Sequence, residues 1–280
     1  MKHTKTLSSL VACLLLSLSL TACGQSQQAT DSNQTSSNES TQSQQVASSD
    51  LKLVNEGMLT LASDFSFAPF EYIENNEKKG FSVELAQALC DKAGLKANWL
   101  DPLKFDTLVP LVKQGGKIDA AWASITINYK RKQEVDFSDP YLDSNQGVIV
   151  ANSSEFNSAA DLNKAGISVG VQSGTTGEEW AKENLTQAET LAFDETTAAF
   201  AALAAGKVQA VCVDLPVIKY NMTSGALKEV KLIEEIPTGE QYGIAVSKDN
   251  PELTKKLNEA LKALKEDGSY DKIYQKYFGN

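Results

Sequence analysis

The chain has 280 residues, of which 42% are hydrophobic, and its 26 Lys and Arg residues against 36 Asp and Glu residues give a formal net charge of −10. This length suits two domains of ordinary size, and the composition is that of a globular protein. The acidic balance argues against a nucleic-acid-binding protein, because such proteins usually present a basic face to phosphate groups.

The first 22 residues have the pattern of a cleaved signal segment. Lys2 and Lys5 precede an apolar run, residues 7–20, that is shorter than a membrane span. The sequence LTAC, which ends at Cys23, places small residues before a cysteine, as in the sites of bacterial lipoprotein signal peptidase. We therefore expect acylation of Cys23 and an extracytoplasmic protein anchored to the outer face of the cell membrane, because two or more acyl chains form a stable anchor. The alternative is an ordinary cleavage site with an accidental cysteine.

Residues 24–50 are almost wholly Ser, Gln, Thr and Asn, with too few apolar residues to fold. We expect residues 23–50 to form a lipidated, disordered tether that carries a globular part away from the membrane.

The residue types that usually carry catalysis or bind metals are sparse. The one histidine of the sequence, His3, lies in the predicted signal segment. Cys90 and Cys212 lie in apolar patterns and are expected to be buried small hydrophobic residues. We therefore predict no catalytic residue, no metal site and no cofactor.

From residue 51 the pattern alternates between strands and helices. Strands are predicted over 58–63, 97–100, 118–124, 147–151, 167–171, 190–193 and 210–213. Helices are predicted over 82–93, 106–114, 128–135, 159–164, 174–185, 195–205 and 251–265, the last of them amphipathic. The alternation predicts the α/β class, with mostly parallel sheets flanked by helices.

Six segments occur in the order and with the content of one known family. They are DxxFAPFEY from Asp64, GFSVELA from Gly80, IDA from Ile118 with ITIxxxR ending at Arg131, VDFSDPY from Val135, VGVxSGTT from Val169, and DGSYDK from Asp267 with KYF from Lys276. Together they resemble the polar amino-acid solute-binding proteins of ABC importers, which include binders of histidine, of lysine, arginine and ornithine, and of glutamine. The resemblance extends from about residue 53 to the C-terminus.

This resemblance implies the two-lobed periplasmic-binding-protein fold of type II, with two hinge strands. Lobe 1 would comprise residues 51–143 and 242–280, and lobe 2 residues 147–238, with hinges near 143–146 and 239–242. Cys90 and Cys212 would then lie in separate lobes, which makes a disulfide between them improbable. The resemblance also implies a monomer that is not an enzyme and whose partner is the permease of an ABC importer.

The candidate site residues fall at strand ends and at a helix start. Arg131 follows a predicted strand, and its planar fork of donors suits the α-carboxylate of a free amino acid. Thr175 and Thr176 lie at a predicted helix N-terminus, which favours an anion. By resemblance, Asp214 would bind the α-ammonium group, with the Ser124 carbonyl and the Thr126 hydroxyl contributing. The alternative for Asp214 is that it only caps the helix that follows.

The ligand's side chain would be surrounded, by resemblance, by Asp64, Phe67, Phe105 and Trp122. The carboxylate of Asp64 favours an amide or cationic side chain, and the aromatic rings could sandwich an alkyl or guanidinium group. Trp122 departs from the histidine-binder pattern, which has an aliphatic residue there, and Ala123 replaces a serine. Any of these aromatic residues could instead belong to the core, which is the interpretation we prefer for the nearby Phe70.

The sequence thus predicts an extracytoplasmic lipoprotein that binds a polar L-amino acid in an interlobe cleft and delivers it to an ABC importer. Glutamine, arginine, lysine, histidine and cystine are all compatible ligands. Two alternatives stay open: a dehydratase on the same scaffold, and an amino-acid sensor head that partners a receptor.

Overall fold

Residues 51–279 are described by a computed structural model, and all of them belong to one unit, Val46–Asn280. The predicted signal segment, the acylation site Cys23 and the predicted tether lie outside the described residues. Within residues 51–279, every helix is too short or too polar to span a bilayer.

Strands and helices alternate along most of the chain, as predicted. The strands are β1 (Met58–Ala62), β2 (Ser66–Phe67), β3 (Glu71–Glu74), β4 (Glu77–Lys79), β5 (Lys96–Trp99), β6 (Ala120–Thr126), β7 (Asp136–Phe137), β8 (Leu142–Ala151), β9 (Ser168–Gln172), β10 (Glu189–Phe193), β11 (Ala210–Asp214) and β12 (Val230–Val246). The helices are α1 (Phe81–Ala93), α2 (Phe105–Gln114), α3 (Tyr129–Glu134), the 3-10 turn η1 (Ala159–Leu162), α4 (Thr176–Asn184), α5 (Thr196–Ala204), α6 (Leu215–Thr223), α7 (Pro251–Glu266) and α8 (Ser269–Phe278).

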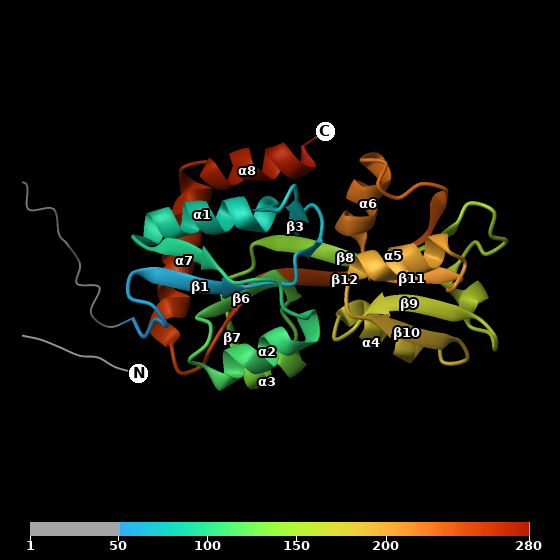
Figure 1. Ribbon diagram of the computed structural model, residues 1–280, viewed down its shortest axis with the longest axis horizontal. Helices are drawn as coiled ribbons and strands as arrows, with labels where there is room; N and C mark the ends of the chain where they lie inside the picture. Colours follow the sequence, from blue (N-terminus) through green and yellow to red (C-terminus); the bar gives the residue numbers. More distant parts are fainter. Residues whose placement is uncertain (1–50, 280) are drawn as a thin grey trace, which may run out of the picture. The chain divides into compact units, whose positions relative to one another are not determined.

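One mixed sheet organises the fold, with the strand order β10-β9-β11-β8-β12-β6-β1-β5 (Figure 1). Strands β1, β5 and β6 pair in parallel at one end, and β9, β10 and β11 do so at the other. Strands β8 and β12 pair antiparallel with each other and with their outer neighbours, so they connect the two parallel groups. We call the part around β1, β5 and β6 lobe 1 and the part around β9, β10 and β11 lobe 2. The predicted two-lobed α/β fold with two connecting strands is confirmed.

Helices cover both faces of each parallel group because successive strand residues point to opposite faces. In β6, Ala120 and Trp122 join the hydrophobic cluster that includes α1 and α7, whereas Ala121 and Ile125 join the cluster that includes α2. Figure 1 shows α1 and α8 on one side of the lobe 1 strands and α2 with α3 on the other. In lobe 2, α4 and α5 contribute to different clusters in the same way. All seven residues of β6 are buried, as expected of a strand covered on both faces.

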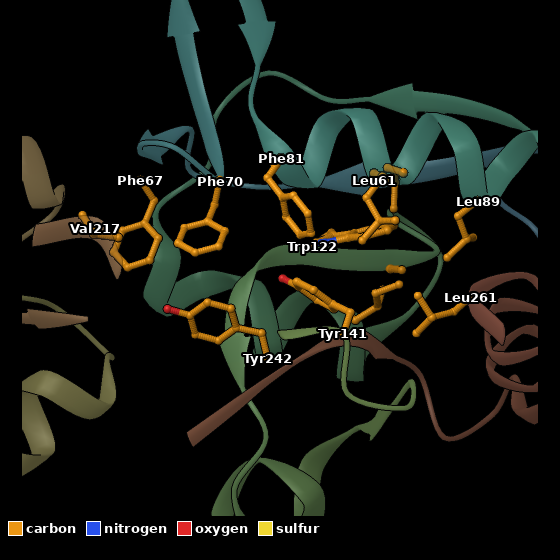
Figure 2. Close-up of a cluster of buried hydrophobic side chains, with 14 of the residues drawn as sticks. Leu61, Phe67, Phe70, Phe81, Leu89, Trp122, Tyr141, Val217, Tyr242 and Leu261 are labelled. Carbon is orange, nitrogen blue, oxygen red and sulfur yellow. The ribbon is translucent and has the colours of Figure 1, made fainter. Parts of the chain in front are cut away.

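A group of aromatic side chains fills the core of lobe 1 and reaches the connecting strand β12 (Figure 2). Phe70 is fully buried, and its ring meets those of Phe81 and Tyr242 edge to face, with centroids 6.2 and 5.3 Å apart. Such pairs add about 0.5–1.5 kcal/mol to the gain from burial. The assignment of Phe70 to the core is therefore confirmed.

Several elements were absent from the sequence-based expectation. The prediction missed the antiparallel sheet β2-β3-β4, the strand β7, the full extent of β12 and the helix α8. The small sheet and the first part of β12 lack a strong periodic signal, because many of their residues are only partly buried or exposed. The apolar residues of α8 do have helical spacing, which the prediction overlooked. The proposed hinge positions lie inside the continuous strands β8 and β12. Cys90 and Cys212 are buried and free, as predicted.

Candidate functional site

A small cavity lies among residues from both lobes at the carboxyl ends of β6, β9 and β11. Its lining residues are Phe67, Phe105, Ala123, Ser124, Thr126, Arg131, Gln172, Thr175, Thr176 and Asp214. The cavity volume is only about 10 Å³, room for about one water molecule. The cavity gathers every predicted ligand-binding residue except Asp64 and Trp122. A molecule larger than water enters this space only if the lobes separate or side chains move.

Arg131 is held by the turn that joins β6 to α3. The side chain of Asn128 caps α3 by accepting a hydrogen bond from the Arg131 backbone N–H at 2.8 Å. The guanidinium group donates from Nη1 to the Thr126 carbonyl at 2.8 Å and from Nη2 to the Gly174 carbonyl at 2.9 Å. Its central carbon lies 5.5 Å from the centroid of the Phe105 ring. Burial lowers the pKa of Arg131, yet a guanidinium group stays protonated in proteins. A fixed cation therefore faces the cavity.

The N-terminus of α4 reaches the same cavity from lobe 2. Thr175 is the N-cap, and its hydroxyl accepts from the backbone N–H of Glu178 at 3.1 Å. The first residue of the helix, Thr176, lies against Thr126 of lobe 1, with 3.5 Å between the two hydroxyl oxygens. The first N–H groups of a helix carry a partial positive charge, so this edge complements Arg131 in attracting an anion.

Asp214 places a carboxylate at the end of β11, and it is 5% exposed. Its oxygens accept from Gln146 Nε2 at 2.9 Å, from Ser144 Oγ at 3.4 Å and from the Tyr242 hydroxyl. Burial, and next the nearby charge of Glu240, raise the pKa of Asp214 to about 6. Asp214 occupies the N-cap position of α6, but its side chain makes no capping hydrogen bond. The carboxylate of Asp214 therefore lines the cavity, and helix capping alone does not explain why an acid stands at this position.

Asp64 and Trp122 lie outside the lining. Asp64 is 6% exposed and accepts from Ser66 Oγ at 2.8 Å and from Gln172 Nε2 at 2.6 Å, so one lining residue separates it from the cavity. Burial raises the pKa of Asp64. Trp122 is fully buried in the lobe 1 core, and its ring centroid lies 5.6 Å from that of Tyr141 (Figure 2). Phe67 and Phe105 therefore supply the aromatic walls.

Sequence reasoning missed several buried polar residues around the cavity. Gln146, Gln172, Glu240 and Tyr242 all bond to predicted site residues. They lie in strands that the sequence shows only as apolar or mixed runs, and their convergence comes from pairing between distant segments.

Glu71 was also missed, although it stands in the DxxFAPFEY motif. It is fully buried, and neither of its carboxylate oxygens has a hydrogen-bond partner among the described residues. Burial raises the pKa of Glu71 well above its usual range, and the side chains of Ser82 and Ser124 oppose that rise. Because Ser124 lines the cavity, Glu71 lies one residue behind the cavity wall.

Among residues 51–279, no three His, Cys, Asp or Glu side chains are grouped so that they could hold a metal ion.

The sequence profile of the "bacterial extracellular solute-binding proteins, family 3" matches residues 59–280. The chain belongs to this family. Among family 3 relatives, the "ABC transporter arginine-binding protein 1" of Escherichia coli K12 is 34% identical over 218 residues, which are 76% of this chain and 87% of the relative. The "ABC transporter glutamine-binding protein GlnH" of Bacillus subtilis 168 is 35% identical over 206 residues, 72% of this chain and 74% of the relative.

Solved structures show the same fold. "An ancestral arginine-binding protein bound to arginine" is 39% identical and superposes with a TM-score of 0.75, covering 80% of this chain and 99% of that protein. The family 3 assignment therefore rests on sequence and on fold together, and it agrees with the resemblance of the six motifs.

Proposed function

We propose that this protein binds a free L-amino acid between its lobes and delivers it to an ABC importer. The observation that carries the proposal is the placement of Arg131 and Asp214, a buried cation and a buried carboxylate, in the lining of one small cavity. A zwitterion satisfies both charges at once. Unpaired charges in a desolvated site are costly, so such a pair favours a ligand of complementary charge pattern.

In this proposal the α-carboxylate binds between Arg131 and the first turn of α4. Arg131 offers a planar fork of donors, and α4 offers backbone N–H groups near Thr175 and Thr176. The α-ammonium group binds Asp214, with the Ser124 carbonyl and the Thr126 hydroxyl as further acceptors. Ser124 has a φ of 48°, a left-handed conformation that is uncommon in a strand and typical of strained functional positions.

The side chain of the ligand extends toward the aromatic walls and the two buried acids. Phe67 and Phe105 line the cavity, whereas Asp64 and Glu71 lie just behind it. Carboxyl groups in this setting favour a cationic or amide side chain. Relatives named as arginine-binding and glutamine-binding proteins support these two chemical classes.

Ligand binding closes the lobes about hinges near 143–146 and 239–242, with lobe 1 formed by residues 51–143 and 242–280 and lobe 2 by residues 147–238. Two hydrogen bonds connect the two lobes: Gln172 of lobe 2 donates to Asp64 of lobe 1 at 2.6 Å, and Asn221 of lobe 2 donates to the Ala68 carbonyl of lobe 1 at 3.2 Å. A ligand that contacts both lobes stabilises the closed form, because only that form makes all its contacts. The importer permease then recognises the closed surface.

The anchor is part of the same proposal. Acylation at Cys23 and a polar tether hold a monomeric binding protein near its membrane partner, outside the cytoplasm. A Cys23→Ser variant is expected to leave the membrane fraction and to lose incorporation of radiolabelled palmitate. Retention of the label in that variant contradicts the anchor while leaving the binding site untouched.

Thermal-shift screening against the twenty amino acids plus ornithine and cystine tests the binding proposal, followed by calorimetry with each compound that shifts the unfolding temperature. At least one amino acid with an amide or cationic side chain is expected to bind. Failure of every compound to bind the ligand-free protein, or conversion of prephenate by it, contradicts the proposal.

A further inference from the structure

The side-chain amide of Gln146 lies among three acceptors that come from three different elements. Its Nε2 is 2.9 Å from Asp214 Oδ1 at the end of β11, 2.9 Å from Glu240 Oε2 on β12, and 3.2 Å from Thr176 Oγ1 on α4. Gln146 is fully buried on β8, and its own Oε1 has no hydrogen-bond partner among the described residues.

Donors and acceptors are mismatched at this nitrogen. An amide NH₂ group has two hydrogens, whereas three acceptors surround Gln146 Nε2, and two of those are carboxylates. A neutral donor also leaves the charges of Asp214 and Glu240 facing each other. An ammonium group brings three hydrogens and a positive charge, which is what this set of acceptors lacks. The raised pKa of Asp214, to which Glu240 contributes, reflects the same shortage of positive charge.

A second observation points to a ligand at this position. Ser124 is 4% exposed, and its hydroxyl has no hydrogen-bond partner among the described residues, although it lines the cavity together with Thr176 and Asp214. Buried polar groups are normally hydrogen-bonded, so an unpartnered hydroxyl in the lining that also holds Thr176 and Asp214 favours a polar ligand in this cavity.

We propose that Glu240 is a ligand-binding residue: together with Asp214 and Thr176 it forms a three-acceptor subsite for the α-ammonium group, and the ligand displaces the Gln146 amide from it. This proposal rests on the proposed function and refines it: the three ammonium hydrogens go to Asp214, Glu240 and Thr176, in place of the Ser124 carbonyl and the Thr126 hydroxyl. The Gln146 amide acts as an internal competitor that holds the subsite together before the ammonium group arrives.

The subsite also links ligand binding to the connecting strands. Glu240 Oε2 accepts from the Thr126 hydroxyl of lobe 1 at 3.2 Å, so one carboxylate group contacts lobe 1 and β8 together. Gly177 lets α4 approach the amide, because a Cβ at that position would lie 2.9 Å from Gln146 Oε1. Displacing the amide therefore changes contacts of both connecting strands and of α4 in one step.

Calorimetry with paired ligands tests the proposal. The probes are L-arginine and 5-guanidinopentanoic acid, which keeps the carboxylate and guanidinium groups and lacks the α-amino group; if the screen returns another amino acid, that compound and its deaminated form replace them. For Glu240→Gln we expect at least a tenfold loss of affinity for the amino acid and a change of less than twofold for the deaminated compound. Glu240→Asp keeps the charge and is expected to restore part of the loss.

Glu235→Gln is the matched control. Glu235 is an exposed acid on β12 whose carboxylate lies 2.9 Å from Lys219 Nζ, so its variant removes a charge from the same strand without touching the subsite or the proposed hinges. We expect its affinity for both probes to stay within twofold of wild type. Gln146→Met, which retains volume and cannot donate, is expected to bind the amino acid at least threefold more tightly, because the internal competitor is gone.

Two sets of results separate the failure of this proposal from that of the proposed function. If no amino acid binds the wild-type protein, the proposed function falls and the subsite falls with it. If wild type binds an amino acid but Glu240→Gln weakens both probes equally, or weakens neither, Glu240 has no contact with the ammonium group. Affinity of Gln146→Met that is equal to or below that of wild type overturns the displacement step.

Discussion

Arg131 of lobe 1 donates a hydrogen bond from Nη2 to the carbonyl of Gly174 in lobe 2, at 2.9 Å. The same guanidinium group donates from Nη1 to the carbonyl of Thr126 at 2.8 Å, so one buried cation connects the ends of β6 and β9. The approach of the two lobes therefore also fixes the position of the Arg131 guanidinium group. Two exposed ion pairs, Lys104–Asp194 and Lys130–Glu179, also cross between the lobes. They contribute little to holding the lobes together, because solvent screens such pairs.

Replacement of Arg131 by Ala is expected to weaken amino-acid binding by at least a hundredfold while the protein still folds. Charged hydrogen bonds contribute about 1.5–3 kcal/mol each, and a bidentate pair supplies two of them. Calorimetry measures the affinity, and circular dichroism confirms the fold. The exposed neighbour Lys132 provides the control, since Lys132→Ala should bind as wild type. Near-normal affinity of Arg131→Ala contradicts the assigned role.

Replacement of Gly174 by Ala is expected to hinder lobe closure. Gly174 has a φ of +77°, and a Cβ there would lie 2.9 Å from the Cβ and 3.0 Å from the Cα of Asp106 in lobe 1. Gly225 is a matched control, because it has the same φ of +77° with nothing within 4 Å of its added Cβ. Both alanine variants should lose about 1 kcal/mol of stability from backbone strain.

The difference between these two variants isolates the contact between the lobes. Gly174→Ala should bind the amino acid at least tenfold more weakly and show a larger radius of gyration with ligand by small-angle X-ray scattering. Gly225→Ala should match wild type in both measurements. Equal ligand affinity of the two variants shows that Gly174 does not limit closure.

The stability of the ligand-free protein should fall as the pH rises from about 4 to 6. Asp214 has a folded-state pKa of about 6, set by burial and Glu240 and opposed by Tyr242, Gln146 and Arg131. The unfolded value is about 3.9, so the folded state holds the proton more tightly. Asp214 contributes about 2–3 kcal/mol to the free energy of unfolding below about pH 4, and this contribution is lost as the pH rises past 6. Denaturant unfolding should show this slope in wild type and a flatter one in Asp214→Asn.

Ligand affinity should have the opposite dependence on pH. The α-ammonium group binds the ionised form of Asp214, so affinity rises with pH and levels off above about 6. Calorimetry between pH 4.5 and 8 should show up to a tenfold loss of affinity per pH unit below the midpoint. A wild-type affinity that stays constant from pH 4.5 to 8 contradicts a binding role for the Asp214 carboxylate.

Substitution of Trp122 should lower mainly the stability of the protein, whereas substitution of Phe105 should lower mainly its affinity for the ligand. Trp122 is fully buried in the core, so Trp122→Phe is expected to cost about 1–3 kcal/mol of stability and to leave ligand affinity within twofold. Phe105 lines the cavity beside Arg131, so Phe105→Leu should weaken binding about tenfold with a smaller effect on unfolding. Urea titration and calorimetry on both variants give the comparison. A tenfold loss of affinity in Trp122→Phe places its ring against the ligand after all.

The sequence by itself determined the class of fold, the positions of most strands and helices, and the family. Periodicity over a few residues predicted β6, β9, β11 and α7 closely, because alternation and helical spacing are local properties. Arg131, Thr176 and Asp214 could be named from the family resemblance together with their local positions. Each ends or follows a strand or begins a helix, and parallel strands bring their carboxyl ends to one edge.

Only the tertiary structure decided which polar groups meet. Trp122, Ser124 and Thr126 are two residues apart on one strand, so the strand period predicts one shared face, yet Trp122 packs in the core and the other two line the cavity. Every residue of β6 is buried, so burial does not distinguish the two roles. Gln146 and Glu240 are 94 positions apart in the chain, and they meet through the antiparallel pairing of β8 with β12. Such contacts depend on register and chain reversal over long distances, which no local pattern of residues encodes.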